Sequence, residues 1–121
     1  MSKSERIIDF TSLIEMLYGE TKYINEFAEA AVQSFSEFQK NYAAFLIERD
    51  EVNFRKAGHK IKPVAQMLGL QLIIDEYEFA KTLIWDKKPD SDLAISVAKM
   101  DGICNQILTE LDDIIRNGFT K

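Results

Sequence analysis

The segment FRKAGHKIKPVAQMLGL, residues 54–70, decides how this chain is expected to fold. Its apolar residues recur at alternating spacings of three and four, which is the pattern of one buried face on an amphipathic α-helix. These residues are Phe54, Ala57, Ile61, Val64 and Leu68. We predict a helix that is capped by Asp50, runs to about Leu68 and is terminated by Gly69.

The chain's only histidine, His59, lies two residues before Ile61. It is therefore roughly 200° around the helix from the middle of the apolar face, and we expect it to face solvent. No acidic residue occurs between residues 54 and 74, although the formal net charge of the chain is -5. The basic neighbours of the histidine are Arg55, Lys56, Lys60 and Lys62. An exposed imidazole among cations is suited to carry a phosphoryl group, because neutral imidazole is nucleophilic and cations stabilise the phosphoryl oxygens.

The rest of the chain also has helical periodicity and shows no sustained alternation typical of strands. Glycines and the loop at residues 86–90 separate the helical segments. We predict a single all-α domain over residues 1–121, an antiparallel up-down-up-down four-helix bundle with an additional short N-terminal helix. The short helix covers about residues 9–18, and the long helices about 21–48, 50–68, 70–85 and 91–117.

Two of the predicted helix starts have several candidate caps. Ser12 and Glu15 fit a capping box for the short helix, and Asp9 and Thr11 are alternatives. Asp90 or Ser91 is expected to cap the last helix.

Composition restricts the class of protein. With 121 residues, 46% of them hydrophobic and 29% charged, the chain suits one globular domain. Its longest apolar runs are too short to span a bilayer, and the N-terminal residues lack the pattern of a signal peptide. Cys104 is the only cysteine, lies on the predicted core face and has no partner for an internal disulfide. We expect a monomeric, cytoplasmic protein, and a pI near 4.9 argues against nucleic acid as the partner.

The histidine segment resembles the histidine-containing phosphotransfer (HPt) family of two-component phosphorelays. The family pattern has an exposed histidine, an apolar residue two places on, a lysine three on, a small residue four on and a glycine ten on. The matching residues here are His59, Ile61, Lys62, Pro63 and Gly69, with Ala57 and Leu70 fitting the flanks. The expected order and lengths of the helices also resemble the family's bundle.

The resemblance implies a phosphocarrier, not an enzyme that turns over. Its histidine would accept a phosphoryl group from an aspartyl-phosphate on one receiver domain and pass it to another. The expected partners are response-regulator receiver domains and a hybrid sensor kinase. The receiver would supply Mg²⁺, and no cofactor or metal is expected on this chain, which has a single histidine.

The residues around the histidine can be assigned roles on chemical grounds. His59 is the predicted phosphoacceptor, and Lys62, one helical turn later, is its predicted electrostatic partner. Gln66 lies on the same face and is a candidate hydrogen-bond donor to a phosphoryl oxygen. Arg55, Lys56 and Lys60 are candidate contacts for an acidic receiver surface, as is Pro63. Gly58 either opens the approach to the histidine or allows close helix packing.

One residue departs from the family pattern. Where the family commonly has glycine after the lysine, this chain has Pro63. A proline there removes the hydrogen bond to the carbonyl of His59 and favours a kink.

The phosphoacceptor domain of sensor kinases is a neighbouring possibility. Its motif has an acidic residue directly after the histidine, and this chain has Lys60 there. Lysine cannot replace that general base, so autophosphorylation from ATP is not expected.

Other interpretations concern surfaces. The alternative to a carrier is a helical adaptor that binds a protein through the basic face without phosphoryl chemistry. Leu72, Phe79 and Leu83 form a second apolar stripe that either packs inside the protein or docks a partner. Two acidic clusters are interpreted as solvated helix faces: Asp75, Glu76 and Glu78 in one, and Glu110, Asp112 and Asp113 in the other.

Overall fold

The computed structural model describes residues 6–118, and residues 1–5 and 119–121 of the predicted domain lie outside them. The described residues form five α-helices and no strands, so the prediction of an all-α protein is confirmed. The helices are α1 (Thr11–Met16), α2 (Thr21–Ile47), α3 (Glu51–Met67), α4 (Gln71–Trp85) and α5 (Asp90–Asn117).

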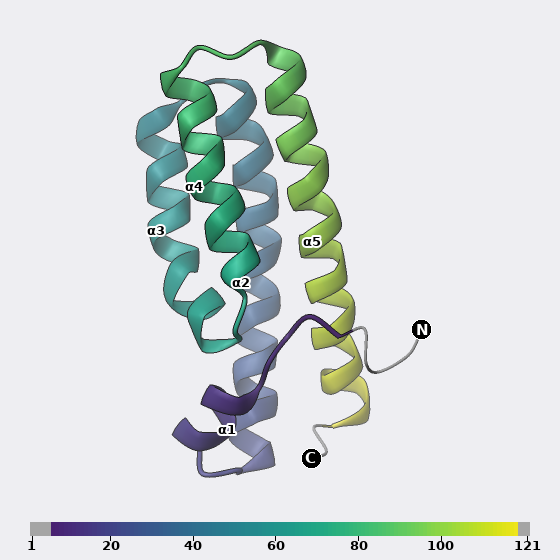
Figure 1. The fold of residues 1–121 in the computed structure, drawn as a ribbon. Helices are drawn as coiled ribbons and strands as arrows, with labels where there is room; N and C mark the ends of the chain where they lie inside the picture. Colours follow the sequence, from purple (N-terminus) through teal and green to yellow (C-terminus); the bar gives the residue numbers. More distant parts are fainter. Residues whose placement is uncertain (1–5, 119–121) are drawn as a thin grey trace.

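Helices α2 to α5 lie side by side, and short loops join consecutive helices at alternating ends (Figure 1). Helix α2 packs against α3 and α5, and α4 packs against α3 and α5. Helix α3 is therefore flanked by α2 on one side and α4 on the other, and its remaining face points outward. None of the helices within residues 6–118 is both long enough and apolar enough to cross a membrane.

A row of aromatic rings runs through the core from α2 through α3 to α4. The ring centroids of Phe38 and Tyr42 are 5.5 Å apart, and those of Tyr42 and Phe54 are 5.0 Å apart. The ring of Tyr77 continues the row, 5.2 Å from that of Phe54. Offset and edge-on aromatic pairs of this kind add stability beyond the area they bury. They fix α3 between its two neighbours.

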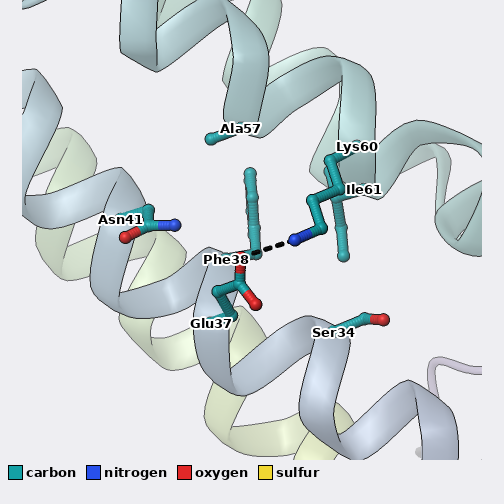
Figure 2. A pocket seen from close by; sticks show the side chains of 7 residues that line it. All are labelled: Ser34, Glu37, Phe38, Asn41, Ala57, Lys60 and Ile61. Atoms are coloured by element: carbon teal, nitrogen blue, oxygen red, sulfur yellow. Dashed lines mark hydrogen bonds and ion pairs between the residues drawn. The ribbon is translucent and has the colours of Figure 1, made fainter.

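An ion pair on the surface also joins α2 to α3. The Nζ atom of Lys60 lies 2.7 Å from Oε1 of Glu37, beside a small hollow between the two helices (Figure 2). Both side chains are more than half exposed, so the pair adds little to stability. The ion pair does orient the Lys60 side chain toward α2.

The predicted boundaries of the histidine helix are confirmed. The Asp50 side chain accepts a hydrogen bond from the backbone N–H of Asn53 at 3.2 Å, which caps the start of α3. Beyond its end, Gly69 adopts a left-handed φ of +66°. A Cβ atom at that position would come within 2.8 Å of the Cβ of Asp9, so the N-terminal segment also requires a glycine there. The N–H of Asp9 donates to the carbonyl of Leu68 at 3.0 Å.

The predicted cap of the last helix is wrong. Helix α5 begins at Asp90, so Asp90 and Ser91 lie inside its first turn, and Pro89 occupies the cap position without a side-chain hydrogen bond. The carbonyl of Pro89 accepts from the N–H of Asp92 at 3.0 Å. The Asp90 carboxylate instead pairs with Arg49 at 3.0 Å.

At the start of α1, the predicted capping box does not form. Phe10 occupies the cap position, and Ser12 lies within the helix. Oδ1 of Asp9, one of the predicted alternatives, accepts hydrogen bonds from both the N–H and the hydroxyl of Thr11, at 2.9 and 2.6 Å. These bonds hold the pKa of Asp9 below its ordinary value.

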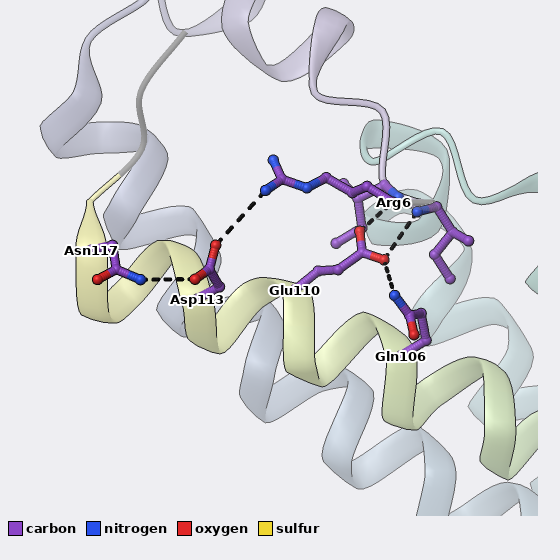
Figure 3. A network of polar contacts seen from close by, with 7 residues as sticks. Arg6, Gln106, Glu110, Asp113 and Asn117 are labelled. Carbon is purple, nitrogen blue, oxygen red and sulfur yellow. Dashed lines mark hydrogen bonds and ion pairs between the residues drawn. The ribbon is translucent and has the colours of Figure 1, made fainter. Parts of the chain in front are cut away.

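Glu110 is buried, contrary to the prediction of a solvated face. It is only 5% exposed, and its carboxylate accepts from the backbone N–H groups of Ile7 and Ile8 at 3.0 and 3.1 Å (Figure 3). The side-chain amide of Gln106 donates a third bond at 2.7 Å. The carboxylate thus satisfies backbone donors that would otherwise be buried without partners. The Glu110 carboxylate therefore holds the N-terminal segment against α5. Asp113, on the same helix, is exposed, as predicted.

Glu76 is the second acidic residue wrongly predicted to be solvated, since it is 6% exposed. The hydroxyl of Ser96 donates to its Oε2 at 2.7 Å, and Lys99 pairs with its Oε1 at 3.0 Å. Tyr42 is hydrogen-bonded to the Ser96 oxygen at 2.7 Å. Because the Ser96 proton is directed to the carboxylate, Tyr42 is the donor in that bond. We call the three buried residues, Tyr42, Glu76 and Ser96, the buried polar cluster. Burial raises the pKa of Tyr42 well above its usual range.

Candidate functional site

The outward-facing surface of α3 carries the residues that the sequence singled out. We define the α3 outer face as Arg55, Lys56, His59, Lys62 and Gln66, all of which are exposed. The opposite side of the helix is buried in the core through Phe54, Ala57, Gly58, Ile61 and Ala65. The same periodicity that buries one face of α3 therefore displays the histidine on the other.

The side chain of His59 has no hydrogen bond or ion pair with any other residue within 6–118. The imidazole is therefore not committed to a structural role among the described residues. A histidine with a structural role is usually buried and hydrogen-bonded, because buried polar groups are nearly always paired. His59 is neither.

The α3 backbone beside His59 packs against the Tyr77 side chain of α4. A Cβ atom on Gly58 would come within 2.0 Å of Cζ of Tyr77, so the tyrosine ring lies directly on the α3 backbone at this point. The Tyr77 hydroxyl donates to the carbonyl of Arg55 at 3.3 Å. Of the two alternatives for Gly58, close helix packing is therefore the one observed. The structure reveals this supporting role of Tyr77, and the signal in the sequence was a glycine inside a strongly periodic helix.

The cations around His59 fall into two groups. Lys56 and Lys62 make no ion pair with residues 6–118. Lys60 is paired with Glu37 and points toward α2, while the guanidinium of Arg55 lies 5.2 Å from the centre of the Trp85 ring. Among the described residues, Lys62, one turn from His59, is therefore an exposed cation without a competing carboxylate.

Pro63 is accommodated within α3, which is continuous to Met67. Because proline has no N–H, it cannot donate the helical hydrogen bond to the carbonyl of His59. Pro63 is exposed, as is Gln66. The backbone carbonyl of Gln66 accepts from the N–H of Gly69 at 3.2 Å at the end of the helix.

Helix α4 contributes two residues, Lys81 and Trp85, at the border of the α3 outer face. The Nζ atom of Lys81 lies 5.1 Å from the centre of the Tyr77 ring and 2.8 Å from the Glu78 carboxylate. Trp85, the last residue of α4, is 52% exposed under Arg55. A lysine four residues after a tyrosine was the available signal for the first contact, but nothing in the sequence pairs Arg55 with Trp85.

The second apolar stripe, Leu72, Phe79 and Leu83, is partly buried and partly exposed. Leu83 is buried at 4% exposure, whereas Leu72 and Phe79 are 38% and 55% exposed. Leu72 and Phe79 line a hollow between α4 and α5 together with Lys99 and Ile103. The stripe therefore faces α5 and not the side of α4 that borders α3.

No family model, curated protein or solved structure matches this chain at a significant level. Within residues 6–118, no three or more His, Cys, Asp and Glu side chains gather in a way that would hold a metal ion. What bears on function is therefore the chemistry of the α3 outer face itself.

Proposed function

We propose that this protein is a phosphorelay carrier of the histidine-containing phosphotransfer type, built on an antiparallel four-helix bundle. One observation carries the proposal. His59 is exposed on α3 without a partner in the described residues, and Lys62, also unpaired there, lies three residues away on the same helix. Residues three apart are neighbours on a helix surface, so the nucleophile and the cation share one site.

The transfer step requires only groups that the site and a receiver would provide. A lone pair on one ring nitrogen of neutral His59 attacks the phosphorus of an aspartyl-phosphate. The bond between phosphorus and the aspartate oxygen breaks, and its electron pair leaves with the carboxylate. The proton on the other ring nitrogen stays in place during the transfer. The reverse of this step delivers the phosphoryl group to the next receiver.

Lys62 contributes electrostatic stabilisation. Phosphoryl transfer passes through a loose transition state in which negative charge is spread over three oxygens. A cation that is already positioned and not neutralised by a carboxylate stabilises that charge most effectively. Gln66, on the same face, would donate a hydrogen bond to one of these oxygens. Lys60, neutralised by Glu37, would contribute less.

The phosphoryl donor in this proposal is a protein and not ATP. Lys60 directly follows His59, where a general base would be needed for attack on ATP. The receiver would bring the Mg²⁺ that screens the phosphoryl oxygens, since magnesium is usually held by carboxylates together with phosphate oxygens. The chain is itself modified and regenerated, so it acts as a carrier.

The direct test is incubation with a receiver domain phosphorylated on aspartate in the presence of Mg²⁺. We expect the intact mass of the wild type to increase by one phosphoryl group, in an acid-labile form that resists alkali, as phosphohistidine does. His59→Gln should remain folded by circular dichroism and gain nothing. A folded wild type that takes no label from a broad panel of receivers, yet binds one of them, would contradict the proposal and support the adaptor.

A further inference from the structure

We propose that the cation–π pair of Arg55 and Trp85 is the anchor at which a phosphorylated receiver domain docks on this protein. The inference rests on the proposed function, because it specifies how the partner is held over His59. The starting observation is an exposed aromatic side chain at the border of the α3 outer face. Trp85 is 52% exposed, and the guanidinium of Arg55 lies 5.2 Å from its ring centre.

The position of the pair places it under any partner that reaches His59. Arg55 precedes His59 by four residues, which is about 6 Å along a helix. A specific interface of ordinary size covers about 800 Å² on each partner, a disc of roughly 16 Å radius. A receiver whose aspartate is centred on His59 therefore covers Arg55 and the Trp85 ring beside it.

The chemistry of the pair suits such a partner. Tryptophan and arginine are the residues most enriched among those that dominate interface energies. The Arg55 guanidinium lies over the ring, 5.2 Å from its centre, and makes no ion pair within residues 6–118, so its N–H groups are available for carboxylates. A receiver pocket that binds Mg²⁺ must present carboxylate oxygens around its aspartate. Lys56 and Lys62, unpaired within residues 6–118, add positive charge to the same face.

Helix α4 also supplies a matched control. Phe79 is 55% exposed, about as much as Trp85, but it lines the hollow facing α5. If exposed aromatic area alone promoted binding, the two residues would be equivalent. If docking is centred on His59, only Trp85 is involved.

The experiment measures the rate of phosphoryl transfer to His59 over a range of phosphorylated receiver concentrations. For Trp85→Ala we expect the half-saturating concentration to rise about tenfold, with the maximal rate within about twofold of wild type. Arg55→Ala should act in the same direction, and Phe79→Ala should leave both parameters unchanged. Labelling by phosphoramidate, a small donor that needs no docking, should be equal in all variants.

A second readout is independent of the substitutions. Trp85 is the only tryptophan of the chain, so its fluorescence reports on this surface alone. A receiver that lacks tryptophan should change the emission of the wild type on binding, and Phe79→Ala should show the same change.

The outcomes separate this inference from the proposed function. If the wild type is labelled by the receiver but Trp85→Ala and Arg55→Ala have the wild-type half-saturating concentration, the docking anchor is refuted and the carrier stands. An effect of Phe79→Ala equal to that of Trp85→Ala would also refute the anchor. If no receiver labels the wild type, the carrier and the anchor both fall.

Discussion

The α3 outer face and the buried polar cluster differ in whether their polar side chains have partners within the protein. In the cluster, both oxygens of the Glu76 carboxylate have partners, Ser96 and Lys99. On the outer face, His59 and Lys62 have none among the described residues. Leaving a buried polar group unpaired costs about 1–3 kcal/mol, whereas an exposed cation is solvated at no such cost. The difference separates polar groups that hold the fold from those that remain available to a partner.

Helix α3 shows the same contrast between two consecutive residues. Gly58 is buried under the Tyr77 ring, and His59, the next residue, is exposed. A substitution at the first should therefore change stability, and one at the second should change chemistry.

The largest effect on stability is expected for Gly58→Ala. The new Cβ would lie 2.0 Å from Cζ of Tyr77, so the ring must move away from α3 and from Phe54. Overpacking of this kind typically costs 1–3 kcal/mol, and we expect about 3 kcal/mol in the free energy of unfolding, measured with denaturant. Gly102→Ala is the control, because nothing lies within 4 Å of its Cβ position. That variant should be as stable as wild type or more so, as alanine favours helices; equal losses in the two variants would contradict the close packing.

The next largest effect is expected for Glu76→Ala. The substitution leaves the Ser96 hydroxyl and Lys99 without the carboxylate, and it opens space between α4 and α5. Because Lys99 is 65% exposed and can turn to solvent, we expect a loss of about 2 kcal/mol, less than for a fully buried ion pair. Glu78→Ala removes an exposed carboxylate two residues away and should cost under about 0.5 kcal/mol. Thermal unfolding of the two variants side by side tests whether Glu76 is structural.

Periodicity predicted the helices and the two faces of α3 because both follow from the order of apolar residues along one segment. The exposure of His59 and the burial of Cys104, whose pKa is raised to about 12 by burial, were predictable in this way. The burial of Glu76 and Glu110 was not, because their partners lie far away in the chain. Glu110 binds the N–H groups of Ile7 and Ile8, about a hundred residues distant.

For the candidate site, the sequence placed the residues of one helix but not those of its neighbour. His59, Lys62 and Gln66 share a face because their spacing requires it. The cation–π contact of Arg55 with Trp85 depends on how α3 and α4 are aligned, and the pairing of Lys60 with Glu37 depends on α2. Such contacts between helices need the packed structure.

A smaller effect, on chemistry alone, is expected for Lys62→Ala. Removing an exposed cation beside the phosphoryl group should slow transfer to His59 about tenfold, which corresponds to about 1.4 kcal/mol of transition-state stabilisation. The free energy of unfolding should change by less than about 0.5 kcal/mol, because the side chain is exposed and makes no ion pair within residues 6–118. Lys60→Ala removes the same charge from a position where Glu37 already neutralises it, so transfer should slow less than twofold. Equal slowing by both variants would show that overall charge, not the position of Lys62, matters.

The smallest effect concerns the start of α3, where stability should depend on pH through Asp50. The side-chain amide and backbone N–H of Asn53 hold the pKa of this carboxyl below its ordinary value. A lowered pKa in the folded state means that the contribution of Asp50 is fully present above the ordinary aspartate pKa of about 3.9 and is lost as pH falls through the lower folded value. The difference in melting temperature between wild type and Asp50→Ala should therefore be constant near neutral pH and shrink in acid. Asp50→Asn keeps the cap but cannot titrate, so its melting temperature should exceed that of Asp50→Ala by the same amount at every pH. If the difference between wild type and Asp50→Ala persists unchanged in acid, the charge of Asp50 does not act through the cap.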